Sequence, residues 1–136
     1  MRQKRLYGLL MVSIIVFSLG GCEEEPSNKD IRDQLIGSWS VVEQNNLKST
    51  DYYTVTIIKS LIDTTKIRIS NFYAIDGTVE ATVTDYYITL PEQLAEGFTF
   101  EGFGDIALTM KKIVWSYTVN HNNGFIDNVT ATYTKK

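Results

Sequence analysis

The sequence is poor in the residues on which most catalytic and metal sites depend. It has one cysteine, Cys22, and one histidine, His121. A single cysteine excludes a disulfide within the chain, and His121 lies in an Asn-rich stretch that predicts a flexible turn, a poor place for a Ser-His-Asp triad. Metal-ligand spacings such as H-E-x-x-H and a glycine-rich phosphate loop are also absent. We therefore predict a protein that is not an enzyme and has no catalytic residues, metal or cofactor. A pair of acids for glycoside hydrolysis stays open, because two distant carboxylates meet only in the folded chain.

Positive charge is scarce in the part of the chain that follows Cys22. Three of the 13 Lys and Arg residues precede Cys22, whereas all 16 Asp and Glu residues follow it, which leaves 10 cations against 16 acids and a net charge of −6. This balance excludes nucleic acid as a partner, since phosphate binding needs clustered Lys and Arg. It also argues against adsorption of the whole protein to anionic lipid. The remaining length suffices for one domain.

The N-terminus has no apolar run of the roughly 20 residues that a spanning helix needs. Residues 1–5 are cationic and residues 6–19 are apolar, a pattern typical of a signal peptide. The next residues, Leu19-Gly20-Gly21-Cys22, resemble the lipobox of bacterial lipoproteins. The resemblance implies cleavage between Gly21 and Cys22 and acylation of Cys22, which anchors the protein to a bilayer. The alternative is a plain anchor helix with an incidental cysteine.

An acidic run, Glu23, Glu24 and Glu25, follows the predicted lipidation site directly. One interpretation is a short solvated tether. The other is that the run resembles a signal that sends some lipoproteins to the outer surface of Gram-negative bacteria. We predict a signal peptide (residues 1–21), a lipidated acidic tether (22–29) and a single β domain (30–136). The expected location is the bacterial outer membrane, lipid-anchored, on its periplasmic or surface-exposed face.

The period of the hydrophobic pattern changes after residue 37. Residues 27–37 predict a short helix that ends near Gly37. Beyond it apolar and polar residues alternate, as where Val79, Ala81 and Val83 are separated by Glu and Thr. Turn signals occur at Asp76-Gly77, Pro91, Glu96-Gly97 and Asn122-Asn123-Gly124. The pattern predicts strands at residues 38–44, 52–60, 66–72, 78–84, 86–90, 98–102, 106–120 with a break near Lys111, and 125–134. We predict an all-β antiparallel meander of about eight strands that forms a small barrel, or alternatively a β-sandwich.

Two resemblances extend this interpretation. Gly37-Ser38-Trp39, after a short helix, resembles the G-x-W signature of lipocalin and other calycin barrels, in which the tryptophan closes one end of the barrel against an arginine of the last strand. Here the last strand ends in Lys135 and Lys136. The second resemblance is to a group of uncharacterised β-rich envelope lipoproteins, and it is carried by the segments at residues 53–57, 69–72, 88–93, 97–102 and 131–135. It implies family membership but no activity.

Aromatic residues are the remaining functional signal. Trp115 and Tyr117 lie two residues apart on one face of a predicted strand. With Tyr53, they are our candidate lining of a ligand pocket, although ordinary core packing explains them as well. The leading hypothesis is a membrane-anchored, lipocalin-like domain that binds a small apolar or aromatic ligand. The alternative is an accessory subunit of the cell envelope, without a ligand cavity, that binds another envelope protein or a glycan.

Overall fold

The described part of the chain folds into one short helix followed by eight strands. The structure, a computed structural model, describes residues 29–47 and 49–136. The predicted signal peptide, the cleavage site at Gly21 and Cys22, and Glu23, Glu24 and Glu25 lie outside the described residues. The elements are α1 (Arg32–Leu35), β1 (Gly37–Gln44), β2 (Thr50–Lys59), β3 (Lys66–Phe72), β4 (Gly77–Thr84), β5 (Tyr87–Ala95), β6 (Phe98–Ile106), β7 (Lys112–Asn120) and β8 (Ile126–Lys135).

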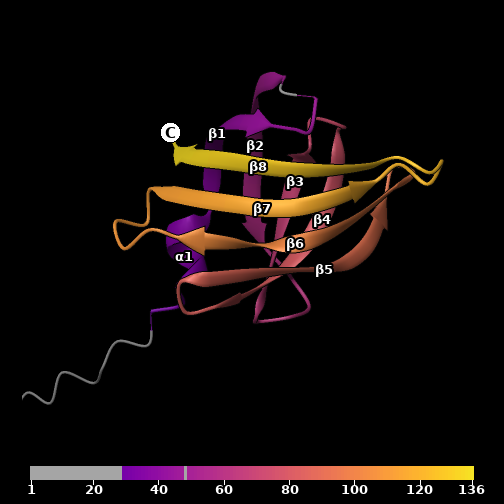
Figure 1. Cartoon of the computed structure of the whole chain (residues 1–136). Helices are drawn as coiled ribbons and strands as arrows, with labels where there is room; N and C mark the ends of the chain where they lie inside the picture. The colour runs from indigo at the N-terminus through magenta and orange to yellow at the C-terminus, as the bar shows by residue number, and fades with distance from the viewer. Residues whose placement is uncertain (1–28, 48) are drawn as a thin grey trace, which may run out of the picture.

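The eight strands form a closed barrel in which each strand pairs antiparallel with the next (Figure 1). The ring is completed by β1 and β8, whose register runs from Trp39 opposite Lys135 to Gln44 opposite Thr130. The prediction of an all-β antiparallel meander barrel preceded by a short helix is confirmed, and the sandwich alternative is excluded by the β1–β8 pairing.

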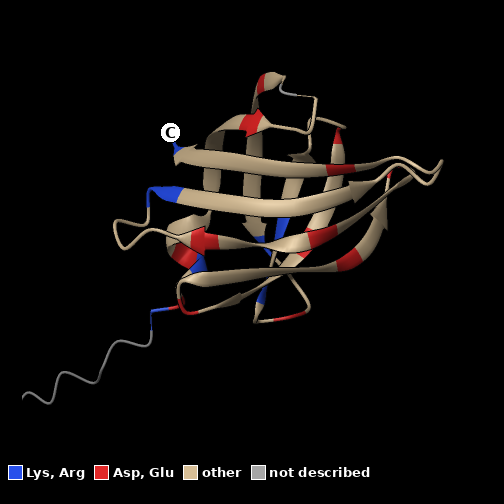
Figure 2. Ribbon diagram, in the orientation of Figure 1, with Lys and Arg blue, Asp and Glu red and all other residues tan. Residues whose placement is uncertain are grey.

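A meander barrel has two different ends, which we name by what they carry. The helix end carries α1, the C-terminus and the β2–β3, β4–β5 and β6–β7 loops. The hairpin end carries the β1–β2, β3–β4, β5–β6 and β7–β8 loops (Figure 1). Lys and Arg gather toward the helix end, whereas the strands toward the β7–β8 loop carry mainly Asp and Glu (Figure 2).

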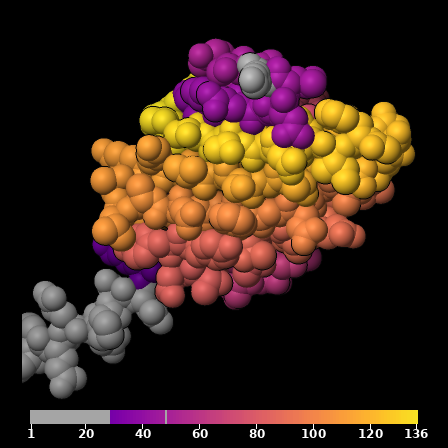
Figure 3. Space-filling model, viewed as in Figure 1, coloured from indigo at the N-terminus to yellow at the C-terminus, as the bar shows by residue number. Residues whose placement is uncertain are grey.

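The core fills the barrel because alternate residues of every strand point inward. On β7, for example, Ile113, Trp115, Tyr117 and Val119 are buried, and the residues between them are exposed. The largest fully buried side chains are Trp39, Trp115, Tyr133, Phe72 and Phe100. Outside, the strands β5 to β8 present a continuous surface of side chains (Figure 3).

Strand β5 departs from the predicted boundaries. The turn predicted at Pro91 is wrong, because β5 continues through Pro91 to Ala95. The register between β5 and β6 shifts between Leu90 and Gln93, and a bulge of this kind accommodates a residue without an N–H donor. The turns predicted at Glu96-Gly97 and Asn122-Asn123-Gly124 are confirmed: Glu96, Gly97, Asn122 and Gly124 all have positive φ.

The helix end is closed by Trp39, which is fully buried. Its indole Nε1 donates to the carbonyl oxygen of Leu35 at 2.8 Å. The Nζ atom of Lys135, on β8, lies 5.8 Å from the centre of the Trp39 ring and donates to the carbonyl oxygen of Gln34. A lysine therefore occupies the position that an arginine takes in the G-x-W resemblance. Gly37 opens β1 with φ of 130°, a conformation that side chains other than glycine rarely adopt.

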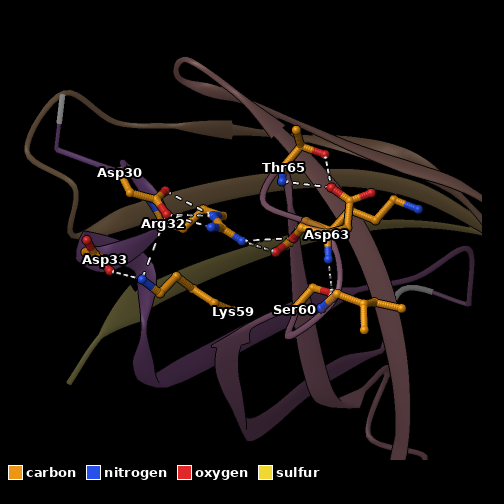
Figure 4. A network of polar contacts seen from close by, with 9 residues as sticks. Asp30, Arg32, Asp33, Lys59, Ser60, Asp63 and Thr65 are labelled. Atoms are coloured by element: carbon orange, nitrogen blue, oxygen red, sulfur yellow. Dashed lines mark hydrogen bonds and ion pairs between the residues drawn. The ribbon is translucent and has the colours of Figure 1, made fainter.

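A polar network joins α1 to the β2–β3 loop (Figure 4). The Arg32 guanidinium is buried, pairs with Asp30 at 2.6 Å, and donates through Nη1 to the carbonyl oxygens of Asp63 and Lys66 at 3.1 and 2.9 Å. Hydrogen bonds from Arg32 hold the pKa of Asp30 below its ordinary value.

Across the residues that the structure describes, no helix has the length and apolar character required to cross a bilayer.

Candidate functional site

A buried carboxylate lies inside the barrel, toward the hairpin end. Glu43 follows Trp39 and Val41 on the inward face of β1, and it is only 2% exposed. The Tyr117 hydroxyl donates to its Oε2 atom at 2.7 Å, and the Tyr53 hydroxyl donates to the same oxygen. Both bonds end on Oε2, and Glu43 Oε1 has no hydrogen-bond partner among the described residues. We call these three residues the Glu43 cluster.

The register of the barrel explains why these side chains meet. Tyr53 pairs with Val41 on the neighbouring strand, so it reaches Glu43 diagonally from β2. Tyr117 extends inward from β7, which β8 separates from β1 in the ring. The small residue Ala131 lies on β8 directly opposite Glu43. A small side chain at this position leaves room for the Tyr117 ring to cross the interior to the carboxylate.

Burial dominates the electrostatics of the Glu43 cluster. Burial raises the pKa of the Glu43 carboxyl above its ordinary value, and the hydrogen bonds from Tyr117 and Tyr53 oppose this rise. Burial likewise raises the pKa of Tyr53 and of Tyr117, so both phenols are protonated donors at neutral pH. A buried acid of this kind costs stability when it is ionised and is found where a protein has a use for it.

Two further polar atoms beside the cluster lack a hydrogen-bond partner. The Trp115 Nε1 atom and the Tyr133 hydroxyl are buried, and neither makes a hydrogen bond within the described part of the chain. The Trp115 ring packs against Tyr133 at 5.7 Å and edge-on against Phe72 at 5.8 Å. Unpaired buried donors are rare in folded proteins and call for a partner such as water or a ligand.

An aromatic cap covers the cluster at the hairpin end. It consists of Tyr73, Phe98, His121 and Phe125, which come from the β3–β4 loop, the start of β6 and the β7–β8 loop. His121 contacts Phe98 and Phe125 with ring centres 4.8 and 4.9 Å apart. Tyr73 contacts Phe98 at 6.0 Å and also Tyr117 at 6.4 Å, so it links the cap to the Glu43 cluster.

The cap is held in place by Asp127, a second acid that is only 2% exposed. Its Oδ2 atom accepts a hydrogen bond from the Tyr73 hydroxyl at 2.8 Å, and its Oδ1 atom accepts one from the backbone N–H of Asn46 at 3.0 Å. The Tyr73 hydroxyl also lies 3.4 Å from His121 Nε2. Asp127, near the start of β8, thereby connects this strand to the β1–β2 and β3–β4 loops.

The β3–β4 loop is strained where it carries the cap. Asn71, near the end of β3, and Tyr73, Ala74 and Asp76 in the loop all have positive φ, between 56° and 61°. Such conformations are uncommon for residues with a side chain and cost of order 1 kcal/mol each. The Asn71 side chain offsets part of this cost, because it donates to the carbonyl oxygen of Thr54 at 2.9 Å and accepts from the N–H of Asp76 at 3.0 Å. Strain of this kind concentrates in segments that move on binding.

All three predicted ligand-lining residues face the interior. Tyr53 and Tyr117 meet on Glu43, whereas Trp115 packs beside them without touching the carboxylate. Whether they line a ligand stays a prediction. The sequence analysis did not identify Glu43 and Asp127 as site residues. The sequence did contain a signal for them, since each is an acid on the apolar face of a regularly alternating strand.

The outside of the barrel carries a shallow groove of about 360 Å³ across β6, β7 and β8. Polar side chains of Glu101, Ser116, Thr118, Asn128 and Thr130 line it, together with the exposed Phe103 ring. Phe103 stacks on Tyr87 with ring centres 5.8 Å apart, and each ring is about 40% exposed. Within residues 29–47 and 49–136, no group of three or more His, Cys, Asp or Glu side chains could hold a metal ion.

The closed ring of eight antiparallel strands with a helix at one end makes the chain a small, lipocalin-like β barrel. It is similar to a redesigned beta barrel, with 12% identity over 79% of this chain and 96% of the other and a TM-score of 0.60. It is also similar to a redesigned beta barrel described as mFAP1 bound to DFHBI, with 18% identity over 78% and 99% of the two chains and a TM-score of 0.59. A third similar structure is EF1p2_mFAP2b bound to DFHBI, with 12% identity over 79% and 98% of the two chains and a TM-score of 0.58. No protein-family model matches the chain, and no curated protein matches it either.

Proposed function

We propose that this protein is a lipid-anchored barrel that binds a small apolar or aromatic ligand at its hairpin end. The observation that carries the proposal is a pair of buried donors without a partner, Trp115 Nε1 and the Tyr133 hydroxyl, together with the buried Glu43 carboxylate, whose Oε1 atom accepts no hydrogen bond from a described residue. Each unsatisfied buried polar atom costs about 1–3 kcal/mol. A ligand that carries both a donor and an acceptor would pair with these atoms and offset that cost.

The same atoms define the chemistry of the ligand. Glu43 Oε1 accepts from a hydroxyl or amine, whereas Trp115 and Tyr133 donate to a carbonyl or ether oxygen. The surroundings are aromatic: Phe72, Phe100 and the cap all contact the cluster or its neighbours. A planar aromatic ring with polar substituents satisfies both requirements, because it stacks against these side chains and presents its edge to the polar atoms.

The ligand would enter through the aromatic cap. Side chains fill the interior, and a small barrel of about eight strands holds at most one small ligand. Entry would require the strained β3–β4 loop to move and Tyr73 to leave Asp127, which opens the cap above Tyr117. Similarity to barrels that hold DFHBI supports the proposal only in that the same fold can accommodate a small molecule.

A thermal-shift and native mass spectrometry screen of the mature protein against small hydroxylated aromatic compounds would test this proposal. A compound at about 100 times its Kd should add about 2.7 kcal/mol of stability. The Tyr53→Phe variant removes a hydroxyl from Glu43 and should weaken binding. The Tyr52→Phe variant is the matched control, because Tyr52 is the neighbouring outward residue and is 77% exposed. Equal losses in both variants, or no stabilising compound at all, would contradict a ligand site at Glu43.

The groove on β6 to β8 favours a second function, that of an accessory subunit that binds an envelope protein or a glycan. Its exposed Phe103–Tyr87 stack beside Ser, Thr and Asn side chains is suited to the face of a sugar ring or to a protein surface. Phe103→Ala should abolish capture of such a partner and leave ligand binding at the hairpin end unchanged. Tyr53→Phe should have the opposite pattern.

A further inference from the structure

Three bulky aliphatic side chains project from loop tips at the helix end. Leu61 and Ile62 in the β2–β3 loop are 95% and 92% exposed, and Leu108 in the β6–β7 loop is 80% exposed. The two loops lie at the same end, because a meander barrel sends alternate connections to the same side. They lie on opposite sides of the rim, because four strands separate the two connections in the ring. Bulky aliphatic side chains this exposed are unfavourable in water, and several of them at one end of a protein indicate contact with a partner or a membrane.

The β2–β3 loop is braced in a way that keeps Leu61 and Ile62 exposed. The Ser60 hydroxyl accepts hydrogen bonds from the N–H groups of Ile62 and Asp63 at 3.4 and 3.3 Å. Asp63 Oδ1 accepts from the Thr65 N–H and hydroxyl at 2.8 and 2.6 Å, and Arg32 binds the loop from below (Figure 4). These bonds hold the loop backbone in the conformation that exposes Leu61 and Ile62.

Positive charge surrounds these apolar tips. Residues 29–36, 59–66, 85–86, 107–112 and 135–136 form the helix end, and they contain eight Lys and Arg against four Asp. Lys66, Lys111 and Lys112 make no ion pair with any described residue. The strands toward the β7–β8 loop carry mainly Asp and Glu (Figure 2). Asp51, Asp76 and Glu96 are among the acids at the hairpin end. The overall negative charge therefore conceals a cationic surface at one end.

The described part of the chain also begins at the helix end, at Lys29 (Figure 1). If Cys22 is lipidated, the seven residues from Cys22 to Lys29 span at most about 25 Å. This argument rests on the anchoring in the proposed function. A tether of this length keeps the helix end, and not the hairpin end, close to the headgroups.

We propose that the helix end is a membrane-docking surface, with Leu61, Ile62 and Leu108 inserted among phospholipid headgroups and the surrounding lysines over anionic lipid. Aliphatic tips flanked by Lys combine the two forces that hold proteins in the bilayer interface. Each lysine near an anionic surface strengthens the interaction about fivefold. The acyl chain anchors the protein, and the docking surface orients it so that the aromatic cap faces away from the bilayer.

The test uses the lipidated protein reconstituted in vesicles of phosphatidylcholine with a minor fraction of phosphatidylglycerol. Because Cys22 is the only cysteine and its thiol is acylated, a cysteine introduced elsewhere is a unique labelling site. A polarity-sensitive fluorophore is attached in the Ile62→Cys variant and, as a matched control, in the Leu47→Cys variant. Leu47 is 74% exposed in the β1–β2 loop of the hairpin end. We expect a blue shift and protection from aqueous quencher at position 62, and neither at position 47.

The outcomes separate docking from anchoring. If the protein floats with the vesicles but both labels stay in water, the docking surface is refuted and the anchor stands. If the protein does not float at all, anchoring through Cys22 is refuted as well. A blue shift at position 62 without vesicles would assign the tips to a protein contact and would also overturn the proposal. Replacing Lys111 and Lys112 by Gln should reduce the blue shift at position 62 if anionic lipid contributes.

Discussion

Removing the Tyr117 hydroxyl should destabilise the protein by an amount that depends on pH. The Tyr117→Phe substitution deletes the 2.7 Å hydrogen bond to Glu43 and leaves the shape of the buried ring unchanged. When Glu43 is ionised, a bond to its charge contributes about 1.5–3 kcal/mol. When Glu43 is protonated, the bond joins two neutral groups and contributes about 0.5–1.5 kcal/mol.

The direction of the pH effect follows from the pKa of Glu43, which burial raises above its ordinary value in the folded state. The folded protein therefore binds this proton more tightly than the unfolded chain, and stability falls as the pH rises from the ordinary pKa of glutamate through the folded pKa. Tyr117→Phe removes a hydrogen bond that lowers the pKa of Glu43, so the variant loses more stability than the wild type as the pH rises. The free energy lost by the variant should grow by roughly 1 kcal/mol between acidic and neutral pH.

Urea unfolding followed by tryptophan fluorescence at about pH 4 and about pH 8 would measure this difference. Tyr52→Phe should change stability by less than about 0.5 kcal/mol at both values, because its side chain is exposed. Glu43→Gln removes the titrating group, so it should gain stability relative to the wild type as the pH rises. A cost of Tyr117→Phe that is the same at both pH values would refute the view that Glu43 ionises inside the barrel.

The remaining predictions concern the frame of the barrel and the predicted lipid anchor. Gly102→Ala should destabilise the barrel by about 3 kcal/mol or more, because the new Cβ would lie 2.4 Å from the backbone oxygen of Ser116. Gly97→Ala, with φ of 83° and nothing within 4 Å, should cost only about 1 kcal/mol in the same unfolding assay. Arg32→Ala should cost about 2 kcal/mol and make the β2–β3 loop sensitive to limited proteolysis, since the carbonyl oxygens of Asp63 and Lys66 each lose a charged donor and keep only a backbone N–H. Globomycin, which blocks lipoprotein signal peptidase, should make the precursor accumulate, and Cys22→Ala should abolish lipid labelling; normal processing in both tests would contradict the lipoprotein prediction.

Much of the barrel was predictable because its strands alternate so regularly. On β7, for example, alternate residues are apolar, so the sequence alone indicates that they point inward: Ile113, Trp115, Tyr117 and Val119. The boundaries of β5 were not predictable in this way. Pro91 lacks a backbone N–H donor, and this property alone indicates a turn. The strand continues through Pro91 because the pairing of β5 with β6 contains a bulge there, and the sequence of β5 by itself does not predict that bulge.

The site was harder to predict than the fold because its members come from strands that are far apart in sequence and become near neighbours only when the ring closes. Glu43 and Tyr117 are 74 residues apart in sequence, and their contact depends on the pairing of β1 with β8. Local patterns carry no information on that pairing. The position of Glu43 did contain a signal, however. It alternates with Trp39 and Val41 on the apolar face of the strand, and an acid on such a face requires buried polar partners.

The pairing of β1 with β8 also determines how the chain must fold. Seven of the eight strand pairings join neighbours in sequence, and each can form as a local hairpin. The eighth brings Trp39 opposite Lys135, almost the whole described length away, and it carries the entropy cost of closing that loop. Such non-local contacts slow folding in all-β proteins. The seam between the first and last strands should therefore close late, and the Glu43 cluster, which spans it, forms only when the ring is complete.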